Sequence, residues 1–273
     1  MSSLRDFLAS ADHITEAEAS SAGQRATPGV GVEVQRLNKF FGSHHVLRDL
    51  DLGVEPGETF VIFGPSGCGK SVLLKHIAGL LLPDSGRILI DGLDLQAGEA
   101  RDHFRLAMVF QSSALFNSLS VGENVGLWMK EHRRGSRAEI ARVVAEKLAL
   151  VGLAGMEQAM PSELSGGMRK RVSIARALAV NPHLILYDEP TAGLDPVLTE
   201  QIGHVIVDLK QLKITSLVVT HDLNLGFHVA DRLGMIHEGR LIEAGAPDRI
   251  RKGTNPVVRA FLSTQTKILE GGA

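Results

Sequence analysis

Residues 58–71 read ETFVIFGPSGCGKS, an apolar stretch that runs directly into a turn with three glycines. Glu58–Phe63 has the short, β-branched and aromatic composition of a buried strand. Val72–Ala78 follows with a helical pattern, which ends at Gly79 with Pro83 just beyond. The stretch therefore predicts a strand, a glycine-rich loop and a helix in immediate succession.

The loop fits the phosphate-binding pattern G-x-x-x-x-G-K-[ST]. Its glycines let backbone N–H groups face a phosphate chain without Cβ clashes, and the helix start adds unpaired donors. We expect Lys70 to reach the β- and γ-phosphates and Ser71 to place its hydroxyl on Mg²⁺. A purely structural turn is the alternative, which the strand–loop–helix context disfavours. The residues expected to bind nucleotide here are Gly64, Pro65, Ser66, Gly67, Cys68, Gly69, Lys70, Ser71 and Val72.

Cys68 is the only cysteine of the chain, so no internal disulfide forms, which fits a reducing compartment. A redox or catalytic thiol is one interpretation of its place in the loop. A small, inward-facing residue is the favoured one, because nothing nearby in the sequence forms a relay with it. A bulky thiol reagent is still expected to block nucleotide entry.

Two carboxylates follow the apolar stretch Leu184–Tyr187. Since a strand points successive side chains to opposite faces, Asp188 and Glu189 are expected to have different roles. We expect Asp188 to hold Mg²⁺, directly or through water, and Glu189 to polarise the attacking water. The alternative is that both acids only cap the next helix.

Polar residues also follow two other apolar strands. His221 comes after Ser216–Val219, which is expected to lie beside the Asp188 strand and so to bring His221 toward the γ-phosphate in a catalytic role. A purely structural histidine is the alternative. Gln111 comes after Ala107–Phe110 and is a candidate ligand of Mg²⁺ or water that reports nucleotide state to the following helical region.

Alternating short apolar strands and helices indicate an α/β fold with a mainly parallel sheet. Further strands are expected at Val32–Leu37, Val46–Val54 and Arg87–Ile90, and helices at Glu123–Met129, Arg137–Val151, Met168–Val180 and Thr199–Leu212. Because no internal repeat is visible, we expect one nucleotide domain. Its predicted limits are 31–263, with a helical subdomain at about 112–180. Residues 1–30 are expected to be a flexible extension with a short helix near Leu4–Leu8, and 264–273 a tail.

Composition narrows the function classes. The 273 residues carry a formal net charge of −2, so no global basic field argues for nucleic acid. The start of the chain has acidic residues where a secretory signal would be apolar, and no run of roughly 20 apolar residues predicts a spanning helix. We expect a soluble chain whose membrane connection runs through a partner.

The stretch Leu164-Ser165-Gly166-Gly167-Met168 resembles the LSGG signature of ABC transporter ATPases. This resemblance covers about residues 32–263. It implies a P-loop NTPase of the ABC type, with a mainly parallel core sheet, an antiparallel β edge and a helical subdomain. It further implies ATP hydrolysis with Mg²⁺ and a head-to-tail homodimer that encloses two ATP. Ser165, Gly166 and Gly167 would then contact the γ-phosphate held by the other subunit.

Two further motifs match the same family. Ala192–Asp195 resembles its D-loop, which implies that Asp195 lies near the dimer seam. Phe41 resembles the aromatic residue that stacks on adenine. The neighbouring Phe40 competes for that role, and Phe41 as an ordinary core residue is the alternative.

A finer resemblance rests on Met168–Arg171, Phe110–Phe116 and Asn255–Leu262, which are similar to the Mla/MCE-associated, or toluene-tolerance, branch. It implies phospholipid or other lipid transport between the inner and outer membranes of Gram-negative cells, from the cytoplasmic face of the inner membrane. The implied partners are an integral membrane permease, a periplasmic MCE-domain protein and a STAS-domain protein. The basic run Arg169–Arg171 is alternatively a solvated helix face or a balance for phosphate charge.

Two other function classes stay open: an ABC ATPase for another cargo, such as an amino acid or an ion, and a non-transport ABC protein that acts on nucleic acid or ribosomes. A second nucleotide domain or long coiled-coil insertion, typical of the latter, is not seen. Leu115, Phe116 and Trp128 are candidates for a groove that receives a permease helix, with burial in the core as an equal alternative.

Overall fold

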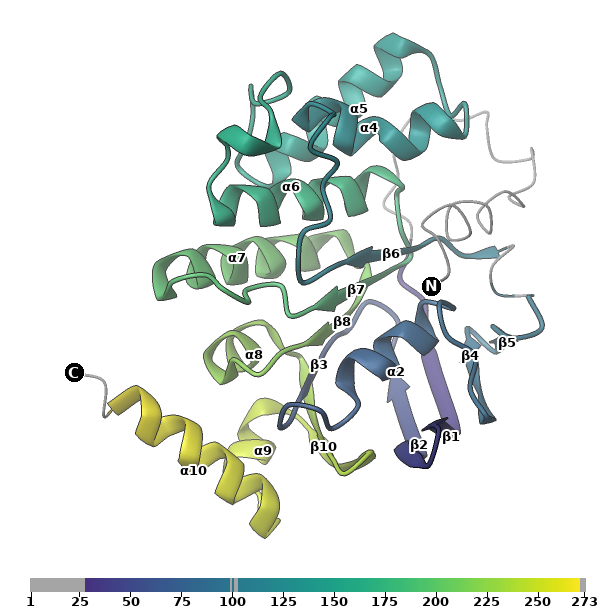
Figure 1. Ribbon diagram of the computed structural model, residues 1–273, viewed down its shortest axis with the longest axis vertical. Coiled ribbons are helices and arrows are strands. Elements are labelled where there is room, and N and C mark those ends of the chain that lie inside the picture. The colour runs from purple at the N-terminus through teal and green to yellow at the C-terminus, as the bar shows by residue number, and fades with distance from the viewer. Residues whose placement is uncertain (1–27, 99, 101–102, 271–273) are drawn as a thin grey trace.

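The structure is a computed structural model of the chain, which describes residues 28–98, 100 and 103–270, with side chains up to residue 264. Two β-sheets form its centre (Figure 1). The larger has six strands in the order β10-β9-β3-β8-β7-β6, and the smaller has four in the order β2-β1-β4-β5. Every described helix packs around these sheets or extends from one end of them.

Five strands of the larger sheet are parallel, and only β10 runs antiparallel, to its neighbour β9. The central strands β3, β7 and β8 are buried at every residue, as expected for a sheet with helices on both faces. The expected parallel core is therefore confirmed. The bounds are β3 Thr59–Phe63, β6 Leu106–Val109, β7 Leu184–Asp188, β8 Thr215–Val219, β9 Arg232–His237 and β10 Arg240–Gly245.

The smaller sheet is antiparallel and supplies the expected β edge. It consists of β1 Val32–Phe41, β2 His44–Val54, β4 Ser85–Ile90 and β5 Leu93–Asp94. Inward residues such as Val34 and Ile88 join one core cluster with Phe60 and Ile62 of β3 and with Leu73 of the helix α2, Lys70–Ile77. This sheet and α2 therefore cover one face of the central sheet.

The other face carries a second core cluster, in which Val61 and Phe63 of β3 meet residues of α6, α7 and α8. The helices α4, α5 and α6 gather at one end of the molecule and form the helical subdomain (Figure 1). The remaining helix bounds are α4 Val121–Glu131, α5 Arg137–Leu150, α6 Gly166–Ala179, α7 Pro196–Leu209, α8 Leu223–Val229, α9 Pro247–Lys252 and α10 Pro256–Glu270.

Side-chain caps move two helix starts away from the positions expected from the apolar pattern. Helix α6 begins at Gly166, two residues before the expected start, because the Ser165 hydroxyl accepts the N–H of Met168 at 3.2 Å. Helix α7 begins at Pro196, where Asp195 accepts the N–H of Leu198 at 2.9 Å. Serine and aspartate are favoured at this position because they satisfy backbone donors that the first turn leaves unpaired.

The structure also adds elements that the sequence did not predict. Strands β9 and β10 and helices α8, α9 and α10 all follow Val219, the end of the last expected strand. Helix α10 continues through residue 263, at which the domain was expected to end. Val30 is 2% exposed, so the chain joins the core just before the expected start at residue 31. The short helix expected near Leu4–Leu8 lies outside the described residues.

Candidate functional site

The glycine-rich loop lies between β3 and α2, at the carboxyl end of the parallel strands. Gly69 starts α2 with a φ of 106°, and a Cβ there would lie 2.7 Å from Leu47 Cδ2. A Cβ on Gly64 would overlap the Ile236 carbonyl, whereas one on Gly67 would meet open space. No side chain caps the start of α2, so its donors face the open side of the loop. The backbone thus forms the cradle that a phosphate chain needs.

The ammonium of Lys70 lies over this loop. Its Nζ donates to the carbonyls of Gly64 and Pro65 at 2.8 and 2.9 Å, and the residue is 7% exposed. These acceptors are neutral, so phosphate oxygens would replace them favourably. The position of Lys70 fits its expected role.

Ser71, in the first turn of α2, contacts Asp188 at the carboxyl end of β7. The Ser71 hydroxyl donates to Asp188 Oδ1 at 2.7 Å, and Asp188 is 8% exposed at the end of β7. Hydroxyl and carboxylate oxygens are the hard ligands that Mg²⁺ prefers. Gln111 follows β6, the strand next to β7, and its side chain is exposed at this same edge. These donors fit a magnesium ion held with the substrate's phosphates.

Glu189 leaves the strand on which Asp188 ends. Its backbone has a left-handed φ of 48°, and its N–H donates to the Val219 carbonyl at 2.9 Å. The turn sends its side chain to His221, whose Nδ1 lies 2.8 Å from Glu189 Oε2. The two acids therefore do contact different groups, and the cause is this backbone turn as well as strand alternation.

The signature and D-loop residues lie at the starts of two helices, α6 and α7. Ser165 and Asp195 are exposed at the first turns of α6 and α7. A Cβ on Gly167 would lie 3.0 Å from Leu198, and one on Gly166 would lie 3.2 Å from Leu194. The two glycines thus let Leu194 and Leu198 pack closely on the start of α6. The first-turn donors of α6, apart from the Met168 N–H that Ser165 accepts, suit a second anion.

Both aromatic residues of the adenine assignment lie at the surface. Phe41 is 50% exposed and Phe40 is 44% exposed. Phe40 stacks on His45 with ring centroids 3.9 Å apart, whereas Lys39 Nζ lies 5.6 Å from the Phe41 ring. Burial of Phe41 in the core, the alternative, is therefore wrong. Phe41 offers the more open ring face.

Cys68 is 8% exposed, next to Lys70. Burial raises the pKa of its thiol, and the nearby Lys70 charge opposes that shift. A thiol held in its protonated form is a poor nucleophile. This agrees with the favoured interpretation of Cys68 as a small, inward residue.

The sequence did not reveal the role of Lys170. The basic run was assigned to a solvated face or to phosphate balance, and Arg169 is indeed exposed, but Lys170 is only 5% exposed. Its Nζ donates to the carbonyl of Gln111 and, at 3.4 Å, to that of Glu189. Burial lowers the pKa of Lys170, and the charges of Glu189 and Asp188 oppose this.

The candidate groove residues are half-buried and form no exposed patch. Leu115 packs against the core cluster of the helical subdomain. Trp128 stacks on His132 with ring centroids 4.7 Å apart. The backbone of Phe116 is held at both its N–H and its carbonyl by the buried side chain of Asn124. This segment is thus partly core, as the alternative anticipated, and rigidly tied to α4.

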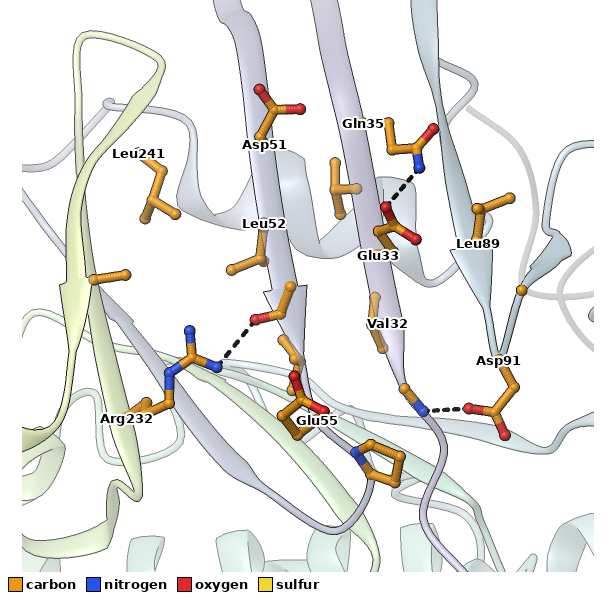
Figure 2. Close-up of a pocket in the computed structure, with 17 residues that line it drawn as sticks. Val32, Glu33, Gln35, Asp51, Leu52, Glu55, Leu89, Asp91, Arg232 and Leu241 are labelled. Atoms are coloured by element: carbon orange, nitrogen blue, oxygen red, sulfur yellow. Dashed lines mark hydrogen bonds between the residues drawn. The ribbon is translucent and has the colours of Figure 1, made fainter.

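A separate hollow of about 550 Å³ is lined by strands β1, β2 and β4 of the smaller sheet and by Arg232, Leu241 and Ala244 of β9 and β10 (Figure 2). Its polar groups bind one another: Gln35 donates to Glu33 at 2.6 Å, Asp91 accepts the N–H of Gly31, and Arg232 donates to the Gly53 carbonyl. None of the residues expected to bind nucleotide lines it. The hollow is therefore separate from the candidate nucleotide site at the edge of the central sheet.

Three comparisons show which proteins this chain resembles. The family model described as ABC transporter matches residues 47–192. The chain is 43% identical over 240 residues to the probable ribonucleotide transport ATP-binding protein mkl of Mycobacterium tuberculosis, which covers 86% of this chain and 67% of that protein. It is also 41% identical over 250 residues to the chloroplastic protein trigalactosyldiacylglycerol 3 of Arabidopsis thaliana, covering 84% and 72%.

A further relative is the Fe(3+) ions import ATP-binding protein FbpC 1 of Pectobacterium atrosepticum, 41% identical over 222 residues, covering 80% of this chain and 62% of that protein. Among solved structures, the dimeric post-hydrolysis state of the ATP-binding cassette MJ0796 bound to ADP and Pi is similar, with a TM-score of 0.71 and 31% identity. That match covers 79% of this chain and 98% of the cassette.

Within the part of the chain that the structure describes, no helix is long and apolar enough to cross a bilayer. The phosphate cradle, the paired oxygen ligands and the matched sequence all lead to one assignment. The chain belongs to the ABC transporter family and is an ATP-hydrolysing nucleotide-binding subunit that uses ATP with Mg²⁺.

Proposed function

We propose that this ATPase works as a head-to-tail homodimer and powers lipid transport between the inner and outer membranes. It does so from the cytoplasmic face of the inner membrane, to which a permease holds it. The observation that carries the dimer is the presence of two helix starts in one chain, at Lys70 behind the exposed Ser66 and Gly67, and at Gly166 beside the exposed Ser165. Each presents unpaired backbone donors suited to a phosphate.

In the proposed dimer, each ATP lies between the loop of one subunit and Ser165, Gly166 and Gly167 of the other. Asp195 lies at the dimer interface, beside the start of α6. The side chain of the neighbouring Val197 is 65% exposed, as a residue covered only in the dimer would be. Phe41 provides an open ring for adenine. Loss of the γ-phosphate removes the shared anion and lets the subunits separate.

In the proposed hydrolytic step, each polar residue at the sheet edge has a role. Lys70 binds the β- and γ-phosphates, and Ser71, Asp188 and Gln111 hold Mg²⁺ or its water ligands. Mg²⁺ held by these residues would supply positive charge that offsets the negative charge of the phosphates. Glu189 accepts a hydrogen bond from the attacking water and draws its proton away. His221 orients the Glu189 carboxylate through the 2.8 Å contact, on the side where the γ-phosphate is expected.

The dimer has a direct test. In a Glu189→Gln background, ATP is expected to convert monomers to dimers, as measured by light scattering. Adding Ser165→Arg should abolish the dimer while each monomer still binds ATP, because the substituted residue would act only on the partner's nucleotide. Adding Lys70→Ala should weaken both ATP binding and the ATP-dependent dimer. ATP-dependent dimers that survive Ser165→Arg would exclude the shared site.

Two observations support a lipid as cargo. The segments Met168–Arg171 and Asn255–Leu262 resemble the lipid-transport branch. One relative, 41% identical, carries the name of a galactolipid. The proposed partners are an integral membrane permease, a periplasmic MCE-domain protein and a STAS-domain protein. The half-buried segment Leu115–Phe116, tied to α4, is the proposed contact for the permease.

The cargo test is a deletion strain complemented with the wild-type gene or with the Glu189→Gln variant. We expect lipid asymmetry of the outer membrane to be restored only by the wild type, and a permease to co-purify with both. Normal asymmetry in the deletion strain would contradict lipid transport.

The second candidate is an ion importer, favoured by the 41% identity to the iron import protein. Uptake of labelled iron by the same strains separates the two. A loss of iron uptake with intact lipid asymmetry would select the importer.

A further inference from the structure

Helix α6 carries two cations that bind backbone carbonyls of the loop after β6. The Lys170 ammonium donates to the carbonyl of Gln111. Two turns further along, the Arg176 guanidinium donates to the carbonyls of Ser113 and Ala114 at 2.9 and 2.6 Å. The two cations therefore hold the first half of the loop between β6 and α4.

This loop has an unusual backbone that needs such support. Ser113 and Ala114 are consecutive non-glycine residues with left-handed φ values of 62° and 46°. Each such residue is strained, and the conformation persists only where its surroundings hold it. Ser113 is also 5% exposed, so its carbonyl needs a partner inside the protein. The Arg176 fork supplies donors to both residues at once.

Lys170 makes a second contact, to the carbonyl of Glu189 at 3.4 Å. Glu189 is itself left-handed, with a φ of 48°, and the N–H of Ala192 donates to the same carbonyl at 3.1 Å. The buried Lys170 ammonium therefore links the backbone of the loop after β6 to the backbone of Glu189, whose carboxylate faces His221. A lysine suits this place because its compact head has three rotatable donors.

We infer that Lys170 is a positioning residue for ATP hydrolysis: it fixes the backbone of Glu189 relative to Gln111, while Arg176 anchors Ser113 and Ala114 of the same loop. Because this loop leads into α4, a shift of the loop would change the position of the Glu189 carboxylate through Lys170. The inference rests on the proposed roles of Glu189 and Gln111. The buried position of Lys170 between these carbonyls, with the charges of Glu189 and Asp188 nearby, is the supporting geometry.

Lys170→Met tests this, because methionine keeps an unbranched side chain and removes all donors. We expect kcat for ATP in the full-length protein to fall by about tenfold or more, since small misplacements of a catalytic group can cost this much. The KM for ATP should stay within about threefold, because Lys170 does not contact nucleotide. Lys170→Arg should recover much of kcat. Lys147→Met is the matched control, since Lys147 is 7% exposed and pairs with Glu146 on α5. It should keep kcat within about twofold.

Arg176→Lys provides a second, independent variant should Lys170→Met fold poorly. It keeps the charge but loses the two-pronged contact, and it should lower kcat with KM unchanged. The inference is overturned if Lys170→Met keeps its kcat, if kcat and ATP affinity fall together, or if Lys170→Arg is no better than Lys170→Met. Glu189→Gln is measured alongside. Its normal turnover would refute the role of Glu189 itself, whereas a slow Glu189→Gln beside a normal Lys170→Met would refute only the positioning role.

Discussion

Nδ1 of His221 lies 2.8 Å from Oε2 of Glu189, although 32 residues separate them. The contact exists because β7 and β8 are parallel neighbours whose carboxyl ends share one edge. The carboxylate side chain is 13% exposed and the histidine side chain 59% exposed. A mostly buried acid is thus oriented by an exposed ring, and five residues of the site give separate tests.

Glu189→Gln should bind ATP and dimerise but hydrolyse slowly. By analogy with the loss of one positioned catalytic group, we expect turnover to fall by about 10²–10³-fold. The amide keeps the size of the side chain and can still contact His221, so nucleotide binding should survive. Phosphate release and equilibrium ATP binding measure the two effects. Normal turnover in this variant would refute the role of Glu189.

His221→Ala should also slow hydrolysis, because the Glu189 carboxylate loses the partner that orients it. We expect a fall of roughly 10²-fold in kcat, at the lower end for a general acid–base participant, with ATP affinity changed less. His204→Ala is the control, since His204 is an exposed histidine of α7 that contacts only His228 among the described rings. Equal rates for the two variants would mean that His221 is structural.

Lys70→Ala should lose nucleotide affinity, because the ammonium that now contacts Gly64 and Pro65 is the expected partner of the β- and γ-phosphates. Charge-assisted hydrogen bonds contribute about 1.5–3 kcal/mol, so the Kd for ATP should rise by about 10- to 100-fold. A fluorescent ATP analogue measures this. Lys75→Ala is the control on the exposed side of α2, and unchanged affinity in Lys70→Ala would contradict the cradle assignment.

Ser71→Ala should raise the Mg²⁺ concentration needed for half-maximal activity, because it removes a proposed oxygen ligand and frees Asp188 from its 2.7 Å partner. Loss of one charge-assisted contact corresponds to about a 10- to 100-fold change. Titrating Mg²⁺ at fixed ATP provides the measurement. Since both residues would hold one ion, combining Ser71→Ala with Asp188→Asn should cost much less than the sum of the single effects.

Cys68 gives a prediction about pH. Burial raises the pKa of its thiol, so the reactive thiolate stays scarce at neutral pH and becomes more abundant as pH rises toward that value. Maleimide labelling should therefore accelerate from pH 7 to pH 9 without levelling off, and labelled protein should no longer bind ATP. ATP itself should protect Cys68. A labelling rate that is already maximal at pH 7 would contradict the buried, protonated thiol.

The sequence alone determined the local parts of this protein. A glycine-rich loop between a strand and a helix is fixed by neighbouring residues, so its phosphate chemistry was predictable from residues 64–71. The buried strands β3, β7 and β8 were predictable for the same reason, since their apolar runs are short and contiguous. The helix starts at Ser165 and Asp195 were placed two to three residues late, because caps depend on hydrogen bonds more than on the apolar pattern.

Only the tertiary structure decided which side chains meet. It turned Glu189 out of its strand onto His221, joined Ser71 to Asp188, and left Phe41 exposed. It also buried Lys170 while its neighbour Arg169 stayed in solvent. Arg169 and Lys170 carry the same charge, so charge alone does not tell which of the two is buried. Which face is covered depends on the loop after β6 and the end of β7, segments that are distant in sequence and that packing brings together.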